Sequence, residues 1–498
     1  AVGASALNAN TTGTSNVAAG KGALTANTTG TGNTAIGYEA LDANTTASYS
    51  VAIGNAALGA STGGTNTAVG GLAADAVTTG TNNVAIGYAS LTATTTGGSN
   101  VAVGHDTLEA NTTTSSLTAI GHQALKANTT GADNTAVGKG AMLVNTTGAQ
   151  SVAVGNITLA ANTTGENNTA LGYAALNANT TASNNTAVGR DALLTNTTGA
   201  SNVAVGKDAL RANTTGTNNI AIGRDALTAN TTANDNVAIG LDALLVNTTG
   251  AENVAIGYGA LDANTTASYN TAVGRLALTA NTTGHSSTAV GKSAGAALTT
   301  GIQNTCIGHT AGDTLTTGHR NIVVGYAADT TYTNSESTIK IGEQFTGNEA
   351  NHTVSLGNDS GYIWNAFTTN ATWAQVSDKR LKKNIEEEDL GLAFINALKP
   401  VTYNWKTNEE IDPEFFESKV HKGEKRDTET TMHGFIAQEV KAAMDSVGNT
   451  TFTGWWDDTG DGEGVGLTDF IMPLVKAIQE LSAEVEELKQ KAHDKCDK

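Results

Sequence analysis

The stretch ALRANTTGTNNIAIG, residues Ala209–Gly223, recurs with small edits along most of the chain and decides its fold. Each copy closes with a glycine that follows Ala-Val, Ala-Ile or a similar pair. Twenty such glycines occur with a 17-residue period, which is broken once, between Gly54 and Gly70. They are Gly3, Gly20, Gly37, Gly54, Gly70, Gly87, Gly104, Gly121, Gly138, Gly155, Gly172, Gly189, Gly206, Gly223, Gly240, Gly257, Gly274, Gly291, Gly308 and Gly325. A fixed period of this length is typical of a stacked repeat architecture.

One repeat contains a strand, a small apolar step and a corner. Polar and apolar residues alternate in "NTAVG", where Thr, Val and Ile are common, and this favours a short β-strand. Four residues after the glycine, 16 of the 20 repeats carry Leu or Met. Seven residues after it, 14 of the 20 carry Asn, usually opening "NTTG". Asn and Gly adopt left-handed backbone readily, so "NTTG" predicts a corner. We expect Ala221, Ile222 and Leu227 to be core residues of their repeat.

Each repeat has few apolar residues, and this affects how many chains are needed to form a core. A single 17-residue coil closes on an interior too narrow to bury much apolar area. Three chains packing their apolar faces around a common axis would remove that shortage, so we expect a trimeric rod of residues 1–328. At about 4.8 Å per coil, 20 coils would measure on the order of 95 Å. A solenoid formed by one chain remains the alternative.

Two features of the repeats leave alternatives open. "NTT" is a glycosylation acceptor pattern, but stacked Asn and Thr side chains that hydrogen-bond from coil to coil, as in amyloid ladders, are the favoured interpretation. The corner Asn is replaced by Ser61, Val77 and Thr94, and later by Leu298 and Leu315. These changes indicate bends or capping repeats, or simple drift between copies.

Composition separates the repeats from the rest and excludes several classes of function. The 498 residues include 57 Gly, 3 Pro and 5% aromatic residues, and the prolines all lie in the last quarter. A formal charge of −19 argues against binding to nucleic acid or anionic membranes, which requires basic clusters. No apolar run of about 18 residues occurs, so no membrane insertion is expected. Cys306 and Cys496 define no disulfide framework, and no cofactor is expected.

The repeats resemble the head repeats of trimeric autotransporter adhesins. The resemblance rests on "NTAIG" at Asn33–Gly37 and "NVAIG" at Asn83–Gly87 and Asn236–Gly240. That family's "NxxAIG" phrases build a trimeric left-handed β-roll from repeats that are generally shorter than those of this chain. The resemblance therefore implies a trimeric β-roll or β-solenoid-like shaft.

The sequence after residue 328 no longer follows the 17-residue repeat. Short strands and turns are expected over 329–376, as a β neck. Three motifs then follow in order: "SDKRLKKNIEEEDLGLAFINALKPVTYNWK" at Ser377–Lys406, "MHGFIAQEV" at Met432–Val440, and "FIMPLVKAIQELSAEVEELKQK". Together they resemble the C-terminal intramolecular chaperone domain of endosialidases and other phage tail fibres and spikes. The resemblance implies that 377–498 is a trimeric α+β domain that guides folding of a β-rich stalk and then cuts itself off.

The same resemblance implies the residues of a self-cleavage site. The bond cut would be Val376–Ser377, with Ser377 as nucleophile and Lys382 as its base. A serine hydroxyl needs a group that accepts its proton, and a lysine does so only if burial or nearby positive charge keeps it neutral.

Further residues match the family's motifs in supporting roles. Asp378 and Arg380 match the first motif and are expected to hold the loop. His433, Gln438 and Glu439 match the second motif and are expected to orient parts of the site.

The last segment predicts a coiled coil over about 469–492. Its apolar residues are spaced alternately three and four apart, and Pro473 marks the helix entry. They are Ile471, Leu474, Ile478, Leu481, Val485, Leu488 and Ala492. Just before it, Asp457–Gly464 resembles the start of a calcium loop, but Thr468 occupies the position that needs a bidentate Glu. A solvated acidic loop without metal is therefore the favoured interpretation.

Together these expectations describe a homotrimeric viral tail fibre for host attachment, folded in the host cytoplasm and extracellular in the mature virion. Its expected partners are two further copies of itself, other tail or baseplate proteins, and a host-surface receptor or glycan. The only enzymatic activity expected is one autoproteolytic cut by a Ser/Lys dyad. The alternatives are a bacterial surface trimeric adhesin with the same chaperone, and an uncleaved fibre whose terminal domain remains as the tip.

Overall fold

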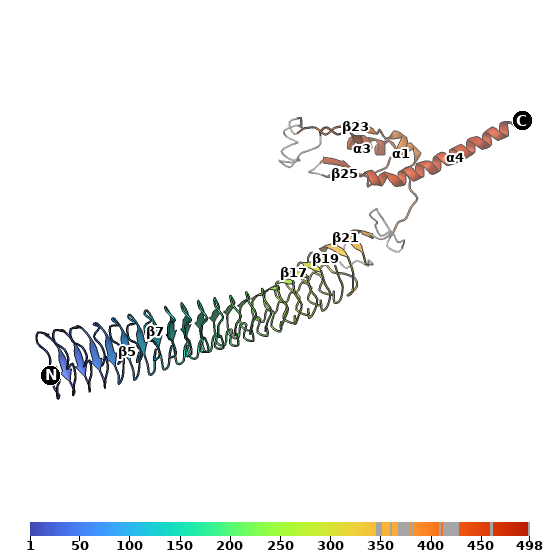
Figure 1. Ribbon diagram of the computed structural model, residues 1–498. Helices are drawn as coiled ribbons and strands as arrows, with labels where there is room; N and C mark the ends of the chain where they lie inside the picture. The colour runs from blue at the N-terminus through green and yellow to red at the C-terminus, as the bar shows by residue number, and fades with distance from the viewer. Residues whose placement is uncertain are drawn as a thin grey trace. The chain divides into compact units, whose positions relative to one another are not determined.

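The computed structural model describes residues 1–344, 351–358, 361–366, 379, 382–407, 410–411, 428–458 and 462–496. The chain divides into two compact units, Ala1–Gln375 and Val376–Lys498. Figure 1 shows the first unit as a stack of coils and the second as a small group of strands and helices with one long helix.

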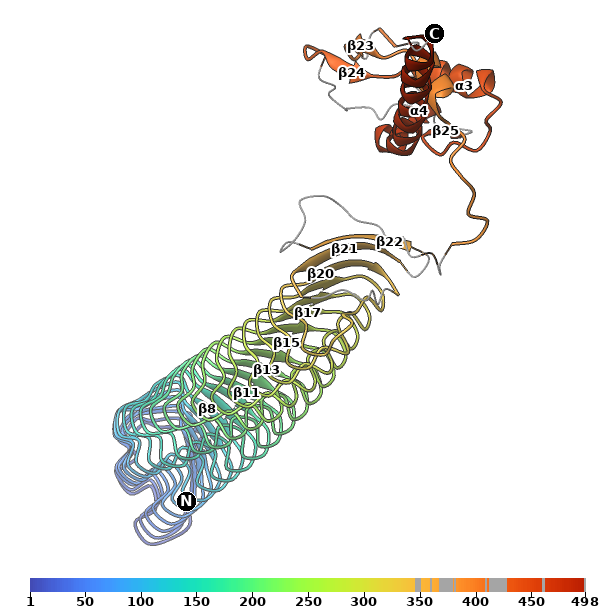
Figure 2. The same cartoon turned by 90° about the vertical axis from the view of Figure 1, so that its right-hand side faces the viewer.

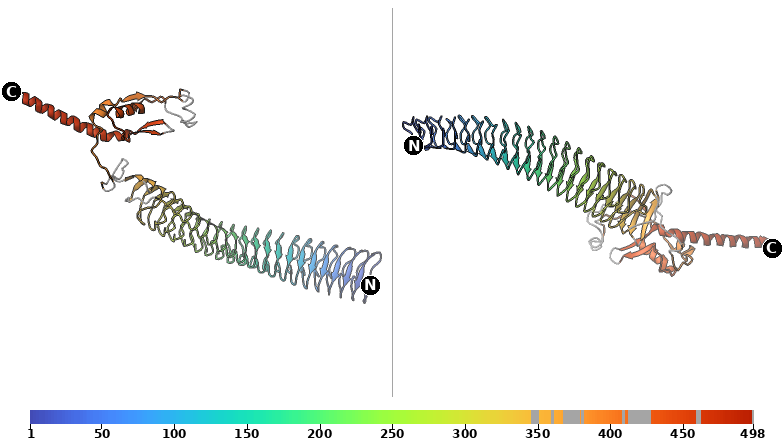
Figure 3. Two further views of the ribbon diagram at one scale, coloured as in Figure 1. Left: turned by 180° about the vertical axis from the view of Figure 1, so that it is seen from behind. Right: turned by 90° about the horizontal axis from the view of Figure 1, so that it is seen from below.

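The first unit is a β-solenoid built by a single chain. The coil of Gly3 contributes an isolated bridge between Val2 and Ala19. Each following coil of the shaft contributes one three-residue strand, which pairs in parallel with the strand of the next coil, as Ala221 does with Ala238. The register of neighbouring strands keeps the 17-residue period of the sequence, except at β3 and β4, where Val51 pairs with Thr67. The coils stack along one gently curving axis, as the yellow-to-blue part of Figure 2 and both views of Figure 3 show.

The repeat strands are nineteen in number among the described residues. They are β1 Val17–Ala19, β2 Thr34–Ile36, β3 Val51–Ile53, β4 Thr67–Val69, β5 Val84–Ile86, β6 Val101–Val103, β7 Thr118–Ile120, β8 Thr135–Val137, β9 Val152–Val154, β10 Thr169–Leu171, β11 Thr186–Val188, β12 Val203–Val205, β13 Ile220–Ile222, β14 Val237–Ile239, β15 Val254–Ile256, β16 Thr271–Val273, β17 Thr288–Val290, β18 Thr305–Ile307 and β19 Ile322–Val324.

Three longer strands follow β19 within the region expected to form a neck. β20 (Ile339–Glu343) pairs in parallel with β19, and β21 (Thr353–Asn358) pairs in parallel with β20. β22 (Gly361–Ala366) then runs antiparallel to β21. The sheet of the shaft therefore continues past residue 328 before its direction reverses.

The backbone of each coil explains why the repeat needs its glycine. Gly223 has a φ of 135°, and a Cβ at this position would lie 2.4 Å from the carbonyl oxygen of Gly240 in the next coil. Three further residues of the same coil, Asn218, Asp225 and Leu227, have φ values of 58°, 59° and 53°. These left-handed residues turn the chain sharply, so a repeat this short suffices to close one coil.

The interior of a coil is narrow and filled by small side chains of the same chain. Ala221, Ala226 and Leu227 are fully buried. The prediction that Ile222 belongs to this core is wrong, because side chains alternate along a strand and Ile220 and Ile222 point outward, 37% and 38% exposed. One chain therefore fills its own coil, and the shortage of interior that we expected for a single chain does not arise.

The corner asparagines form the predicted ladder. Asn213 Nδ2 donates to Oδ1 of Asn196 at 2.8 Å and to the carbonyl oxygen of Gly216 at 2.9 Å. Asn230 Nδ2 donates in turn to Asn213 Oδ1 at 2.9 Å. Asn213 is fully buried, so the nitrogen that a glycan would modify is already engaged inside the coil. The ladder interpretation of "NTT" is confirmed.

A second column of asparagines, four residues before most of the glycines, was not predicted. The backbone N–H of Asn219 donates to Oδ1 of Asn202 at 2.9 Å. Its Nδ2 donates to the carbonyl oxygen of Ala233 at 2.8 Å. Beside these columns Thr214 Oγ1 donates to the carbonyl oxygen of Thr231 at 3.0 Å. Most of these buried asparagines are thus paired from coil to coil, as burial requires, with exceptions such as Oδ1 of Asn264 and the side chain of Asn281.

A deeply buried carboxyl lies near the end of the shaft. Asp329 takes the inward position that Leu holds in most repeats and is 3% exposed, and its Oδ2 accepts a hydrogen bond from the Thr314 backbone N–H at 3.1 Å. Burial, assisted by the carboxyl of Asp313, raises the pKa of Asp329 to about 6. Burial also raises the pKa of the Cys306 thiol to about 12, so this thiol stays protonated.

The second unit is a small α+β arrangement. Its elements are α1 (Leu392–Ala397), β23 (Val401–Tyr403), β24 (Met432–Gly434), α3 (Ala437–Ser446), β25 (Trp455–Asp458), β26 (Gly462–Val465), the 3-10 helix η2 (Leu467–Phe470) and α4 (Ile471–Cys496). β23 pairs antiparallel with β24, and β25 with β26.

An aromatic cluster holds this unit together. The buried rings of Phe394 in α1 and Phe470 in η2 lie 6.2 Å apart, and Phe452 approaches both edge-on at 5.3 and 5.0 Å. Val440 and Met444, one turn apart on α3, complete the core. The apolar residues of α3 fall on one side because they repeat at helical spacing.

These two units confirm the predicted fold class: a mainly β shaft of 17-residue repeats followed by an α+β region that ends in a long helix. Within the described part of the chain, no helix has the length and apolar character needed to span a membrane.

Candidate functional site

The first predicted motif is only partly described by the structure. Val376, Ser377, Asp378 and Arg380 lie outside the described residues, so the geometry between nucleophile and base is not defined. Lys382 is exposed, and its backbone N–H donates to the carbonyl oxygen of Lys379 at 3.2 Å. The structure thus shows the predicted base at the surface of the single chain.

The second motif forms a strand and a helix start. His433 is exposed in β24, where it pairs in register with Thr402 of β23. The chain then enters α3 at Ala437, which carries Glu439 in its first turn, where a negative charge complements the helix dipole. The sequence from Ala437 onward is rich in good helix formers, which explains where the helix begins.

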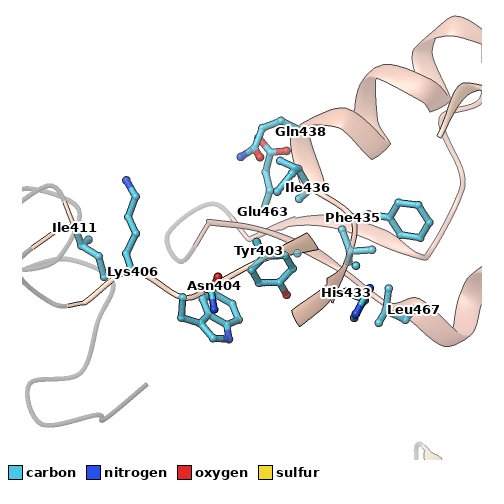
Figure 4. A pocket seen from close by; sticks show the side chains of 15 residues that line it. Tyr403, Asn404, Lys406, Ile411, His433, Phe435, Ile436, Gln438, Glu463 and Leu467 are labelled. Carbon is cyan, nitrogen blue, oxygen red and sulfur yellow. The ribbon is translucent and has the colours of Figure 1, made fainter. Parts of the chain in front are cut away.

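Two of the predicted residues, His433 and Gln438, line one cavity of about 830 Å³. Tyr403, Trp405 and Glu463 are also among its lining residues, and they come from β23, the chain after it, and β26. Figure 4 shows Gln438 and Glu463 side by side, with Tyr403 beneath them and His433 farther along the wall. The β23–β24 pairing and the β25–β26 hairpin therefore bring residues about 60 positions apart to one concave surface.

Glu439 does not line this cavity. Its Oε1 lies 3.9 Å from Nζ of Lys399, and among the described residues its buried Oε2 has no hydrogen-bond partner. The rotation of about 100° between successive helix residues separates Glu439 from Gln438. Of the three residues of the second motif, the structure brings two together and turns the third toward Lys399.

The cavity contains aromatic residues that sequence reasoning did not assign to a site. The rings of Tyr403 and Trp405 meet edge-on with centroids 5.4 Å apart, and Trp405 is 44% exposed. An exposed tryptophan on a cavity wall is a signal of binding, because such a ring buries a large area when covered. The phrase "VTYNW" contained this signal, but only the pairing of β23 places it beside the second motif.

The acidic stretch before the final helix is a hairpin. Asp457 and Asp458 belong to β25, and Asp457 pairs with Glu463 of β26. Thr468 lies in η2. Across the described residues, no three His, Cys, Asp or Glu side chains are grouped to hold a metal ion.

Helix α4 presents an apolar stripe to solvent. The seventh predicted seam residue, Ala492, is exposed. The other six are between 40% and 63% exposed: Ile471, Leu474, Ile478, Leu481, Val485 and Leu488. At its start the helix is anchored to its own unit, because Glu480 Oε2 accepts a hydrogen bond from the backbone N–H of Leu392 at 2.6 Å. The stripe is therefore a surface left open by the single chain.

Residues 377–449 match the family model described as chaperone of endosialidase. No curated protein matches the chain. The matched segment contains the first motif, β23, β24 and α3, and so includes Ser377, Lys382, His433, Gln438 and Glu439. The chain thus joins a β-solenoid shaft to a C-terminal segment of the intramolecular chaperone class.

Proposed function

We propose that the protein is a homotrimeric viral tail fibre for host attachment, whose C-terminal unit assembles and registers three chains and then cleaves the Val376–Ser377 bond. The observation that carries this proposal is the chaperone family match at 377–449, which follows the repetitive shaft after the neck region. A repetitive shaft has a register problem, because a slip by one coil costs few contacts. A chaperone that gathers three chains at one end supplies the missing register.

The exposed stripe on α4 supports self-association. Six apolar residues in a three-four spacing, none buried by its own chain, are typical of a coiled-coil seam before assembly. In isolated peptides, Ile or Val alternating with Leu along the seam favours a coiled coil of two helices. In this proposal the attached α+β unit instead sets the number of chains at three. The trimer would bury the stripe against two further copies.

The assembly test is the mass of the intact chain in solution, measured by light scattering. Leu488→Lys places a charge in the seam and is expected to weaken the trimer. Gln490→Lys adds the same charge on the opposite side of α4 and is expected to leave the trimer intact. A wild-type chain that is monomeric at micromolar concentration contradicts the proposal.

The proposed cleavage uses the hydroxyl of Ser377. Its oxygen attacks the carbonyl carbon of Val376 while its proton passes to Lys382. The C–N bond breaks, the proton goes to the leaving amine of Ser377, and an ester joins the two parts. Water then hydrolyses the ester to the Val376 carboxylate and the free hydroxyl. Lys382 is exposed in the single chain, so burial by neighbouring copies would have to keep it neutral.

Cleavage is tested on denaturing gels and by mass spectrometry of the folded chain. Wild type is expected to give a fragment that begins at Ser377. Ser377→Ala and Lys382→Met are expected to remain full length, whereas Lys383→Met, next to the motif, is expected to be cut. If wild type forms the trimer and stays uncut, the protease part of the proposal is wrong and the uncleaved fibre takes its place.

We also propose that the cavity lined by His433 and Gln438 orients the segment that is cut. Both residues come from the second motif, and their side chains lie on one concave wall. His433→Ala is expected to slow the appearance of the Ser377 fragment while leaving the trimer mass unchanged. Met432→Ala, on the neighbouring residue outside the cavity lining, is the matched control. Equal cleavage rates for both variants contradict this role.

A further inference from the structure

The outward face of the shaft carries four parallel columns of side chains. Side chains alternate along a strand, so the residues three and one before each glycine point outward. The mostly exposed residues five before and directly after each glycine flank the strand on its two sides and complete the four columns. In the coil of Gly138 they are Asp133, Thr135, Val137 and Lys139. The two middle columns are Thr, Val, Ile or Leu throughout β2 to β19, and many of these side chains are more than a third exposed.

The column that follows the glycines, here called the post-glycine column, is basic and aromatic. It holds seven of the ten Lys and Arg residues of 1–328 and five of the seven Tyr, but no Asp or Glu, although the same region has 15 acidic residues. Its rings stack from coil to coil, with Tyr88 and His105 at 5.4 Å and His105 and His122 at 5.5 Å. Random placement along the repeat would not gather these residues at one position.

The column five residues before the glycines, here called the pre-strand column, is polar and partly acidic. It consists mainly of Ser, Asn and Gln, with Asp133, Asp235 and Glu252 as its acids, Arg320 as its cation, and two exposed tyrosines. Asp133 and Lys139 are both exposed, and within the described residues neither makes an ion pair in its own chain. By contrast, Arg190 and Lys207 already pair with the aspartates that follow them, at 3.0 and 2.7 Å.

Rotational symmetry brings the two columns to the same level. A rotation about the fibre axis does not change the height of a residue along that axis. In a closed ring of copies, the post-glycine column of one copy therefore lies next to the pre-strand column of the following copy. The two columns are separated by about a third of a repeat, which is about 2 Å along the axis at a coil spacing of about 4.8 Å. Residues of the same coil on neighbouring copies therefore meet.

Ten coils carry a charged residue in one or both columns; in three of them the facing residue would be complementary, and in the other seven it would be uncharged. In the coil of Gly138, Lys139 would meet Asp133 of the next copy. In the coils of Gly274 and Gly325, a cation would meet an aromatic ring: Arg275 with Tyr269, and Tyr326 with Arg320. No coil of the twenty brings two like charges together at this level.

We propose that this four-column face is the interface between copies of the chain, with the post-glycine column of each copy packed against the pre-strand column of the next. The middle columns of Val, Ile and Thr then line the common axis. This inference rests on the trimer proposed above and adds which face is used and which residues meet. The Lys139–Asp133 meeting in the coil of Gly138 favours the in-register arrangement and adds to the register that the C-terminal unit is proposed to set.

Disulfide trapping in the full-length chain tests this interface. In a Cys496→Ser background, Lys139→Cys combined with Asp133→Cys places a thiol on each flank of one coil; Cys306 is buried and does not interfere. Mild oxidation is expected to link three chains covalently on a non-reducing denaturing gel. Within one chain the two positions are separated by the strand, on the order of 15–20 Å. A disulfide requires Cα atoms within about 7 Å, so the link must join different copies.

The matched control is Lys139→Cys with Ser201→Cys, which moves the second thiol four coils along the same pre-strand column. It is expected to give no linked trimer if the copies are in register. A chain that is trimeric by light scattering but is not linked by the 133–139 pair, or is linked equally by the 139–201 pair, overturns the proposed interface while the trimer stands. A monomeric chain instead refutes the trimer itself, and the interface with it.

Discussion

Replacing Asn213 by Ala is expected to open the shaft locally, in its own coil and the two coils beside it. The change removes three hydrogen bonds: two donated by Asn213, to Asn196 Oδ1 and to the Gly216 carbonyl, and one accepted from Asn230. Of the groups left behind, only Asn196 Oδ1 loses its side-chain donor altogether, because the Gly216 oxygen still accepts from Asn202 Nδ2 at 2.8 Å and Asn230 Nδ2 still donates to the Ala233 carbonyl at 3.1 Å. A buried polar group that loses its partner costs about 1–3 kcal/mol, so the expected cost is about 1–3 kcal/mol.

The location of this effect follows from the architecture. Each coil contacts only its neighbours, so the lost free energy lowers the local opening energy and leaves distant coils unchanged. The backbone N–H of Thr214, which donates to the Thr231 carbonyl at 2.9 Å, is a direct reporter. Since about 1.4 kcal/mol corresponds to a factor of ten, exchange of this amide is expected to speed up by about one to two powers of ten.

Hydrogen exchange with mass spectrometry on peptides covering residues 196–233 is the assay. Thr215→Ala is the matched control, because this exposed neighbour in the same "NTTG" corner takes no part in the ladder through its side chain, and surface changes of this kind stay within about 0.5 kcal/mol. If Asn213→Ala and Thr215→Ala accelerate exchange equally, the ladder does not stabilise the coil and the reasoning fails.

Two further predictions concern the backbone and a buried carboxyl. Gly223→Ala is expected to lower the free energy of unfolding by at least about 1–3 kcal/mol, because alanine rarely adopts a φ of 135° and its Cβ would press on the Gly240 carbonyl. Gly59→Ala is the control, because a Cβ at that position has ordinary space. Equal melting temperatures for the two variants would contradict the argument. Asp329 has a folded pKa of about 6, above its value of about 3.9 when unfolded, so the folded state binds the proton more tightly. The stability that this carboxyl contributes to the last coils is therefore fully present below about pH 4, falls by about 2–3 kcal/mol as pH rises to about 6, and is then constant. Asp329→Asn should flatten this dependence in urea melts followed between about pH 4 and 7, and an unchanged slope would show that Asp329 is not its source.

The C-terminal unit shows which parts of a functional site a local sequence motif can predict and which parts it cannot. His433 and Gln438 were selected by motif, and the cavity they share requires β23 to pair with β24 and the β25–β26 hairpin to close the far wall. Glu439 follows Gln438 directly, yet helical rotation turns it toward Lys399. A linear motif cannot distinguish such neighbours, because their separation is decided by secondary structure and packing.

The repeat by itself determined the coil period, the strand and the asparagine ladder, because each depends on residues a fixed number of positions apart. Left-handed backbone was expected at the Asn and Gly of "NTTG", but it occurs elsewhere in the coil, at Asn218, Asp225 and Leu227. The repeat did not decide which apolar residues face inward. Ala221 and Ile222 are adjacent and both apolar, and only the closed coil, whose narrow interior holds alanine at this position of the strand, turns Ala221 in and Ile222 out. Tertiary structure also created the second asparagine column and the outward face, since both arise from contacts between neighbouring coils, which stack segments that are distant along the chain.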